Sequence, residues 1–76
     1  MILDYIEYTI INAMIKRKRP LTIRQLTGIM LGSKEAAVQK TVEKLLEDNL
    51  IIDPKKDGHY VITIFGWNAW DHYISR

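Results

Sequence analysis

The stretch from Leu21 to Leu50 contains two runs of apolar residues at helical spacing, separated by a short break. Thr22 stands just before the first run, where its hydroxyl predicts an N-cap. The apolar residues of that run return every third or fourth position, as one helix face requires: Ile23, Leu26, Ile29 and Met30. Leu31 and Gly32 interrupt the pattern. The spacing therefore predicts a short helix that ends in a glycine-containing turn.

A second helix is predicted directly after this turn. Ser33 is its expected N-cap, and Glu35 adds negative charge to the first turn, where the helix dipole favours it. The core-facing positions of this helix are Val38, Thr41, Val42, Leu45 and Leu46. Asn49 follows the last apolar pair and suits the left-handed conformation at a helix end. Together the two runs predict a helix-turn-helix.

Residues 2–18 predict a helix that precedes this unit. Its inward stripe is expected to consist of Leu3, Ile6, Ile10, Ala13 and Met14. Four further apolar residues lie largely off that stripe: Tyr5, Tyr8, Ile11 and Ile15. Pro20 ends the helix because the residue before a proline is pushed out of the helical region. The first helix thus carries more apolar surface than one small core needs.

The C-terminal third predicts a hairpin followed by a last helix. Residues 50–52 and 59–62 are suited to strands, and residues 54–58 have the composition of a charged turn. Thr63 is the expected N-cap of a helix that runs through Ile74. Its apolar residues form two neighbouring stripes: Phe65, Ala69 and Tyr73, and Trp67, Trp70 and Ile74. The predicted order is therefore helix, helix-turn-helix, hairpin and helix.

Composition excludes several classes of protein. The 76 residues are expected to form one domain, 1–76, with 47% apolar and 26% charged residues, which is ordinary for a globular protein. There are no cysteines, so disulfides and thiolate metal sites are excluded, and a cytoplasmic protein is expected. Asp4, Glu7 and Asn12 interrupt the apolar N-terminal segment, so neither a signal peptide nor a membrane span is expected.

The order of the elements and several short motifs resemble the winged helix-turn-helix superfamily of DNA-binding domains. The motifs are Leu31-Gly32-Ser33, then Val38, Leu45 and Leu46, then Glu47-Asp48-Asn49-Leu50-Ile51, and finally Ile62-Thr63-Ile64-Phe65-Gly66. Asn49 stands where many members have glycine, and Ile62 where they have leucine. The resemblance covers almost the whole chain. It implies an α+β fold with three helices, a two-stranded hairpin called the wing, and a C-terminal helix.

The resemblance also implies binding of double-stranded DNA. The helix at 33–48 would lie in the major groove, and the wing at 53–59 would contact the backbone. With the apolar face turned inward, the DNA-facing residues are expected to be Ser33, Lys34, Ala36, Ala37, Gln39, Lys40 and Lys44. Arg24, Lys55 and Lys56 are further phosphate candidates. The alternative is an ordinary solvated helix face, with Glu43 and Glu47 paired to lysines across a turn.

Two other features have more than one explanation. The basic run at 16–19 suits the negative end of a helix dipole, and it is also a candidate for phosphate binding. The aromatic surplus on the terminal helices predicts a homodimer interface made by Tyr5, Tyr8, Trp67, Trp70, Tyr73 and Ile74. The alternative is that the first helix and the hairpin cover these rings as core.

The leading hypothesis is a small winged-helix transcriptional regulator that binds DNA as a homodimer. The second hypothesis is a winged-helix module that binds another protein through its aromatic face, which the modest net charge of +2 favours. No enzyme, cofactor, membrane or small-molecule ligand is expected. A metal site is not expected either, because His59 and His72 stand 13 residues apart without ligand partners at metal spacing.

Overall fold

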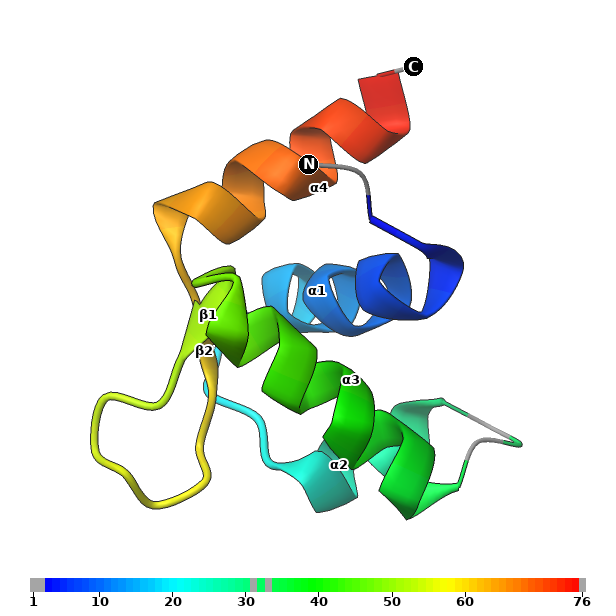
Figure 1. Cartoon of the computed structure of the whole chain (residues 1–76), viewed down its shortest axis with the longest axis vertical. Coiled ribbons are helices and arrows are strands. Elements are labelled where there is room, and N and C mark those ends of the chain that lie inside the picture. The colour runs from blue at the N-terminus through cyan, green and yellow to red at the C-terminus, as the bar shows by residue number, and fades with distance from the viewer. Residues whose placement is uncertain (1–2, 31, 33, 76) are drawn as a thin grey trace.

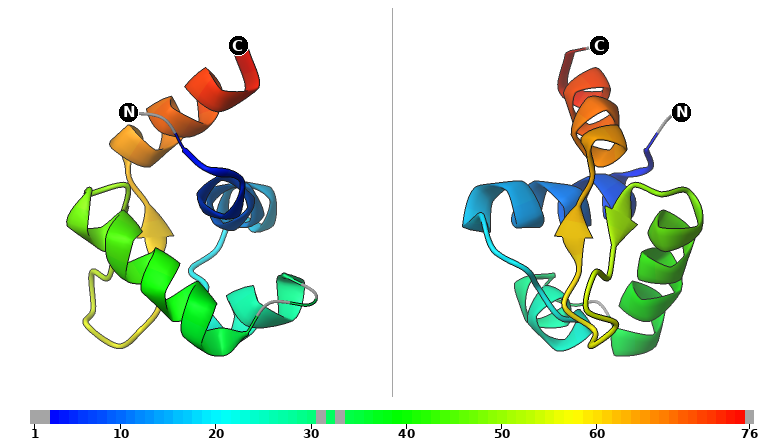
Figure 2. Two further views of the ribbon diagram at one scale, coloured as in Figure 1. Left: turned by 45° about the vertical axis from the view of Figure 1, so that its right-hand side comes forward. Right: turned by 90° about the vertical axis from the view of Figure 1, so that its left-hand side faces the viewer.

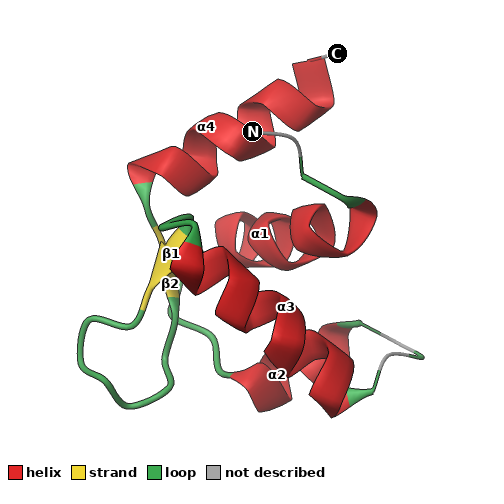
Figure 3. Ribbon diagram, in the orientation of Figure 1, coloured by secondary structure: helices red, strands yellow, loops and turns green. Residues whose placement is uncertain are grey.

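The computed structural model describes residues 3–30, 32 and 34–75, and these form an α+β fold. Across the described residues four helices accompany one antiparallel hairpin, as predicted (Figures 1 and 3). The elements are α1 (Tyr5–Arg17), α2 (Ile23–Ile29), α3 (Glu35–Glu47), β1 (Ile51–Ile52), β2 (Val61–Ile62) and α4 (Ile64–Ser75). The ends of the first helix lie inside the predicted range, and both strands are shorter than predicted.

Side-chain caps fix where the first two helices begin. The Asp4 carboxylate accepts the Glu7 N–H at 2.8 Å, and the Glu7 carboxylate accepts the Asp4 N–H at 3.0 Å, which completes a capping box. Thr22 and Gln25 form the same reciprocal pair at the start of α2, so the predicted Thr22 cap is confirmed. At α3 the N-cap residue is Lys34, without a side-chain cap. The predicted cap Ser33 lies outside the described residues.

Left-handed residues end α1 and α3. Lys18 has φ 54° and its N–H donates to the Met14 carbonyl. After α3, Asn49 has φ 60°, as its position in the sequence predicts. The N–H groups of Asn49 and Leu50 donate to the carbonyls of Leu46 and Leu45, each at 3.0 Å, in a Schellman arrangement. The chain therefore leaves α3 in a fixed direction, toward β1.

The hairpin pairs Ile51 with Ile62 and Ile52 with Val61. A bridge on the other side of β2 joins Tyr60 to Leu21, whose backbone groups exchange hydrogen bonds of 2.8 and 3.1 Å. This bridge was not predicted. In Figure 2 the segment before α2 lies on the side of the hairpin opposite to α3, and the bridge and the α3–β1 packing agree with that view.

Thr63 links the hairpin to α4. Its hydroxyl accepts the Gly66 N–H at 3.1 Å, which confirms the predicted cap, and donates to the Asn49 carbonyl at 2.6 Å. Gly66 packs directly against the backbone carbonyl of Leu50, so a Cβ at this position would collide with it. The start of α4 is therefore fixed against the end of α3.

α1 forms the centre of the core. α4 covers one side of α1, while α2, α3 and β2 pack on the others (Figure 1). Ile11 and Ile15 are buried and Ile6 is 43% exposed, so the predicted single stripe was wrong at these three positions. The reason is the second layer: α4 buries a face of α1 that a one-sided helix would expose. In the described ranges no helix combines the length and the hydrophobicity that crossing a bilayer requires.

Candidate functional site

The outer face of α3 carries most of the residues that were predicted to face DNA. Val38, Val42 and Leu45 are buried beneath it at helical spacing. All the predicted DNA-facing residues of the helix that are described lie exposed on the opposite side: Lys34, Ala36, Ala37, Gln39, Lys40 and Lys44. Neither the hairpin nor α4 covers them. Ser33, the remaining one, lies outside the described residues.

Lys44 differs from the other exposed lysines of α3 because it reaches back to α1. Its ammonium lies 3.6 Å from the carboxylate of Glu7, whose side chain is only 3% exposed. Glu7 also accepts the Asp4 N–H, so both of its oxygens have partners. Sequence reasoning missed this buried acid. The Asp4-x-x-Glu7 spacing of a capping box was the signal that could have found it.

Acids balance the bases along α3. Its exposed charges are Lys34, Lys40 and Lys44 against Glu35, Glu43 and Glu47. Glu43 and Glu47 share a shallow hollow with Lys40, Thr41 and Lys44. In the described part of the chain the only contacts within 4.0 Å between a basic and an acidic side chain are those of Lys44 with Glu7 and of the His59 imidazole with Asp57. The pairing of Glu43 and Glu47 with lysines, which the alternative of a solvated helix face predicted, is therefore absent from the described residues. The exposed side chains of the first two turns are small or amide, apart from the charged residues Glu35 and Lys40.

The hairpin tip is a closed turn held by Asp53. Its carboxylate accepts the N–H groups of Asp57 and Gly58 at 3.2 and 3.0 Å. This arrangement leaves Lys55 and Lys56 exposed, and Lys56 has φ 54°. The N–H of His59 donates to the Asp57 carboxylate and holds the pKa of that carboxyl below its usual value near 3.8. The predicted wing thus presents two lysines on a hydrogen-bonded tip.

Tyr60 lies at the base of the tip, half-buried against the core. Burial raises the pKa of its hydroxyl, and the negative charges of Asp53 and Glu43 raise it further. Glu43 belongs to α3, so its charge reaches the base of the hairpin.

The remaining basic candidates lie away from the outer face of α3. Arg24 is exposed in the first turn of α2. Residues 16–19 are all exposed at the end of α1. Arg19 and Pro20 line a hollow of about 330 Å³ together with four residues of the hairpin tip: Pro54, Lys55, Asp57 and His59. The structure therefore brings the basic run next to the tip, which the sequence pattern did not indicate.

Three of the six predicted interface residues, Tyr8, Trp70 and Tyr73, contact each other or α1 and are half-buried, and a fourth, Trp67, meets Trp70 edge to face with ring centroids 5.7 Å apart. Tyr8 and Tyr73 stack with ring centroids 4.2 Å apart. The Trp70 indole donates to the Asn12 amide oxygen at 3.1 Å. These contacts run antiparallel between α1 and α4 and leave the three rings half-buried. The other three predicted residues are largely exposed, namely Tyr5 at 72%, Trp67 at 45% and Ile74 at 48%.

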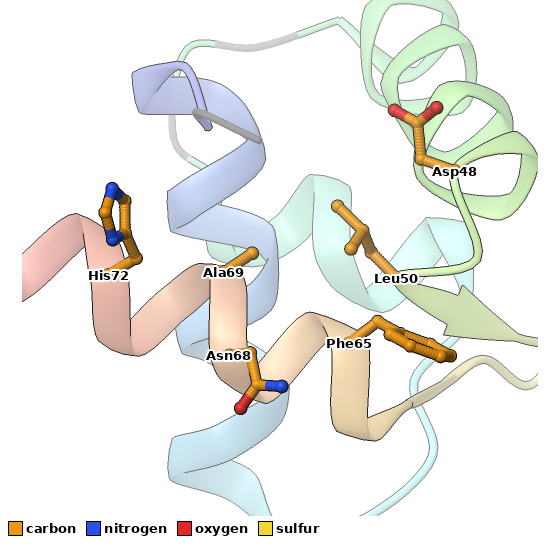
Figure 4. A pocket seen from close by; sticks show the side chains of 6 residues that line it. All are labelled: Asp48, Leu50, Phe65, Asn68, Ala69 and His72. Atoms are coloured by element: carbon orange, nitrogen blue, oxygen red, sulfur yellow. The ribbon is translucent and has the colours of Figure 1, made fainter.

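A second apolar feature was not predicted as a site. Asp48, Leu50, Phe65, Asn68, Ala69 and His72 line a hollow of about 310 Å³ between the end of α3 and α4 (Figure 4). Phe65 lies at its edge and is 61% exposed, and its neighbour Ile64 is 70% exposed. No three His, Asp or Glu side chains in the described ranges come close enough together to hold a metal ion.

Comparison with known proteins shows a similarity of fold. No protein-family model matches the chain, and no curated protein matches it. Among solved structures, the chain is similar to a crystal structure at 2.2 Å resolution of a protein described as hypothetical, with a TM-score of 0.76 and 17% sequence identity. The match covers 92% of this chain and 24% of the other, so this chain spans about a quarter of that protein's length. At this identity the similarity shows the fold alone.

Proposed function

We propose that this chain is a winged helix-turn-helix domain of a transcriptional regulator that binds double-stranded DNA with the outer face of α3. The observation that carries the proposal is the division of α3 into two faces. Val38, Val42 and Leu45 are buried, and the first two turns present small, amide and cationic side chains to solvent together with one acid, Glu35. A helix of this kind fits the width of the major groove.

Each exposed residue of those turns has a specific role in the proposal. Ala36 and Ala37 are small enough for close approach and can contact thymine methyl groups. Gln39 can form a bidentate pair with adenine, and Lys34 and Lys40 can meet phosphate or guanine. Lys44 contributes less, because its ammonium already lies 3.6 Å from the Glu7 carboxylate. Arg24 and the hairpin tip with Lys55 and Lys56 would contact the backbone.

We further propose that the protein acts as a homodimer through α1 and α4, with Tyr5, Trp67 and Ile74 as the direct contacts. Tyr8, Trp70 and Tyr73 would support that surface from within the chain. Sedimentation velocity tests the proposed homodimer. We expect the wild-type protein to sediment as a dimer and the Trp67→Ser variant to sediment as a monomer. A wild-type monomer at all concentrations would contradict it.

Fluorescence anisotropy with labelled random-sequence duplexes tests DNA binding. Binding at low salt that weakens steeply as salt rises is expected. Lys40→Gln should weaken it, while the control Glu47→Gln, which removes a charge of opposite sign from the same helix, should not. Absence of binding at low salt, or affinity that does not depend on salt, would refute the proposal.

Two observations favour a second function, namely a module that binds another protein without contacting DNA. The α3 face has as many acids as lysines, and an apolar edge at Ile64 and Phe65 flanks the hollow beside α4. Phe65→Ser distinguishes the two functions, because it should leave DNA affinity unchanged if α3 is the binding face.

A further inference from the structure

We propose a second contact with DNA phosphates, formed by the end of α1 and the hairpin tip on the side of the hairpin opposite to α3. This inference rests on the proposed DNA binding and locates the main electrostatic part of it. We name the surface the basic end, and it consists of Lys16, Arg17, Lys18, Arg19, Lys55 and Lys56. Its expected ligand is the phosphodiester backbone of duplex DNA, bound without regard to sequence.

Charge is the first argument. All six cations of the basic end are exposed, and the only acids of the tip are Asp53 and Asp57. Both of these carboxylates already accept backbone N–H groups of the turn. On α3, by contrast, three lysines face three glutamates, and one of the lysines is paired with Glu7. The local field that attracts a polyanion is therefore stronger at the basic end than on the helix that would read the bases.

Geometry is the second argument. Arg19 and Lys55 line the same hollow although they stand far apart in the sequence. Arg19 also lines a neighbouring hollow with Lys18, Pro20 and Trp67. The bridge between Leu21 and Tyr60 holds the two chain segments side by side (Figure 2). Two cations from separate segments thus flank one concave surface, where a phosphate group can meet both.

Backbone conformation is the third argument. Lys18 and Lys56 both have φ 54°, a conformation that favours glycine and that only short polar side chains otherwise adopt readily. The other non-glycine residue at positive φ in the described ranges is Asn49, which tolerates this conformation. The helix dipole accounts for Lys16 and Arg17 in the last turn of α1. It does not account for lysines at two strained positions, nor for Arg19 beyond the helix.

Glycine substitutions separate charge from stability. Lys18→Gly with Lys56→Gly removes two cations and relieves two strained backbones, so the thermal midpoint should stay the same or rise. The slope of log affinity against log salt, measured with a random-sequence duplex, should fall by about 2, since each phosphate contact contributes about 0.9. Arg19→Gln with Lys55→Gln, both exposed and without a backbone effect, should give the same loss. Lys34→Gln with Lys40→Gln on α3 is the matched control, because it also removes two exposed cations.

The outcomes are distinct. If both double variants of the basic end keep the wild-type salt slope while Lys34→Gln with Lys40→Gln weakens binding, the inference is refuted and the proposed function stands. If the wild-type protein binds no duplex at low salt, the proposed function and this inference fail together. If both double variants of the basic end lose slope and the Lys34→Gln with Lys40→Gln variant loses less than either, the basic end supplies the main electrostatic contact.

Discussion

α1 and α3 have the same length, 13 residues each, but their environments differ completely. α1 buries six residues, and α4 covers it on the side away from α3. α3 buries three residues, leaves Thr41 and Leu46 half-buried and exposes its other residues to solvent. The difference indicates a division of roles: α1 holds the other elements together, and α3 presents side chains outward. Substitutions in α1 should therefore change stability, and substitutions on α3 should change binding.

The largest expected effect is on stability, from truncation at the centre of α1. Ile11→Ala removes a side chain with 0% exposure, and should lower the free energy of unfolding by about 3 kcal/mol. Ala37→Ser on the exposed face of α3 is the matched control, with an expected change below about 0.5 kcal/mol. Urea denaturation followed by circular dichroism measures both. If Ile11→Ala lowers the free energy of unfolding no more than Ala37→Ser does, the proposed difference in role between α1 and α3 is wrong.

The next largest effect is expected from substitutions of Glu7 on α1, whose carboxylate contacts Lys44 of α3. Glu7→Ala removes the capping bond to the Asp4 N–H and the partner of Lys44, and should cost about 2 kcal/mol of unfolding free energy. Glu7→Gln retains an acceptor for that bond and should cost less than about 1 kcal/mol, because Lys44 is 60% exposed and its ion pair is screened by solvent. Equal losses in the two variants would show that charge, not capping, is what Glu7 contributes.

A smaller effect is expected in binding rather than stability. Lys40→Gln should leave the thermal midpoint unchanged, because the side chain is exposed and no ion pair holds it. Its DNA affinity should fall about tenfold, which corresponds to about 1.4 kcal/mol. Anisotropy titration at one low salt concentration measures this change. A stable variant with unchanged affinity would remove α3 from the binding surface.

The smallest effect is confined to the hairpin tip. The pKa of Asp57 is lowered in the folded chain, so its contribution to stability is present above the unfolded value near 3.8 and is lost as pH falls through the folded value. An NMR titration of the His59 amide should therefore show a midpoint below 3.8, with no coupled change in α1 or α3. A midpoint above that value would mean that the tip does not stabilise the ionised carboxylate.

Local patterns in the sequence predicted the elements and several of their ends. The Thr22 and Thr63 caps, the left-handed Asn49 and the buried Val38, Val42 and Leu45 all depend on neighbours within a few residues. Such patterns are sufficient for helix ends and for the choice of which face of α3 is buried.

The features that sequence reasoning missed are contacts between distant segments. Ile11 and Ile15 are buried because α4 packs across α1, and a single helical period cannot reveal a second covering layer. The Leu21 bridge to Tyr60 and the position of Arg19 beside Lys55 likewise depend on the path of the chain. The exposed face of α3 and the cations of the basic end could be predicted from the sequence, whereas the position of Arg19 beside Lys55 could not.

Chemical-shift mapping of the labelled protein with a short duplex tests the central claim most directly. The account predicts that the backbone amides of Ala36, Gln39 and Lys40 shift most among the helices, while those of the buried residues Ile10 and Ile11 stay in place. Shifts confined to α4, or none at all under conditions where the protein is folded, would contradict it.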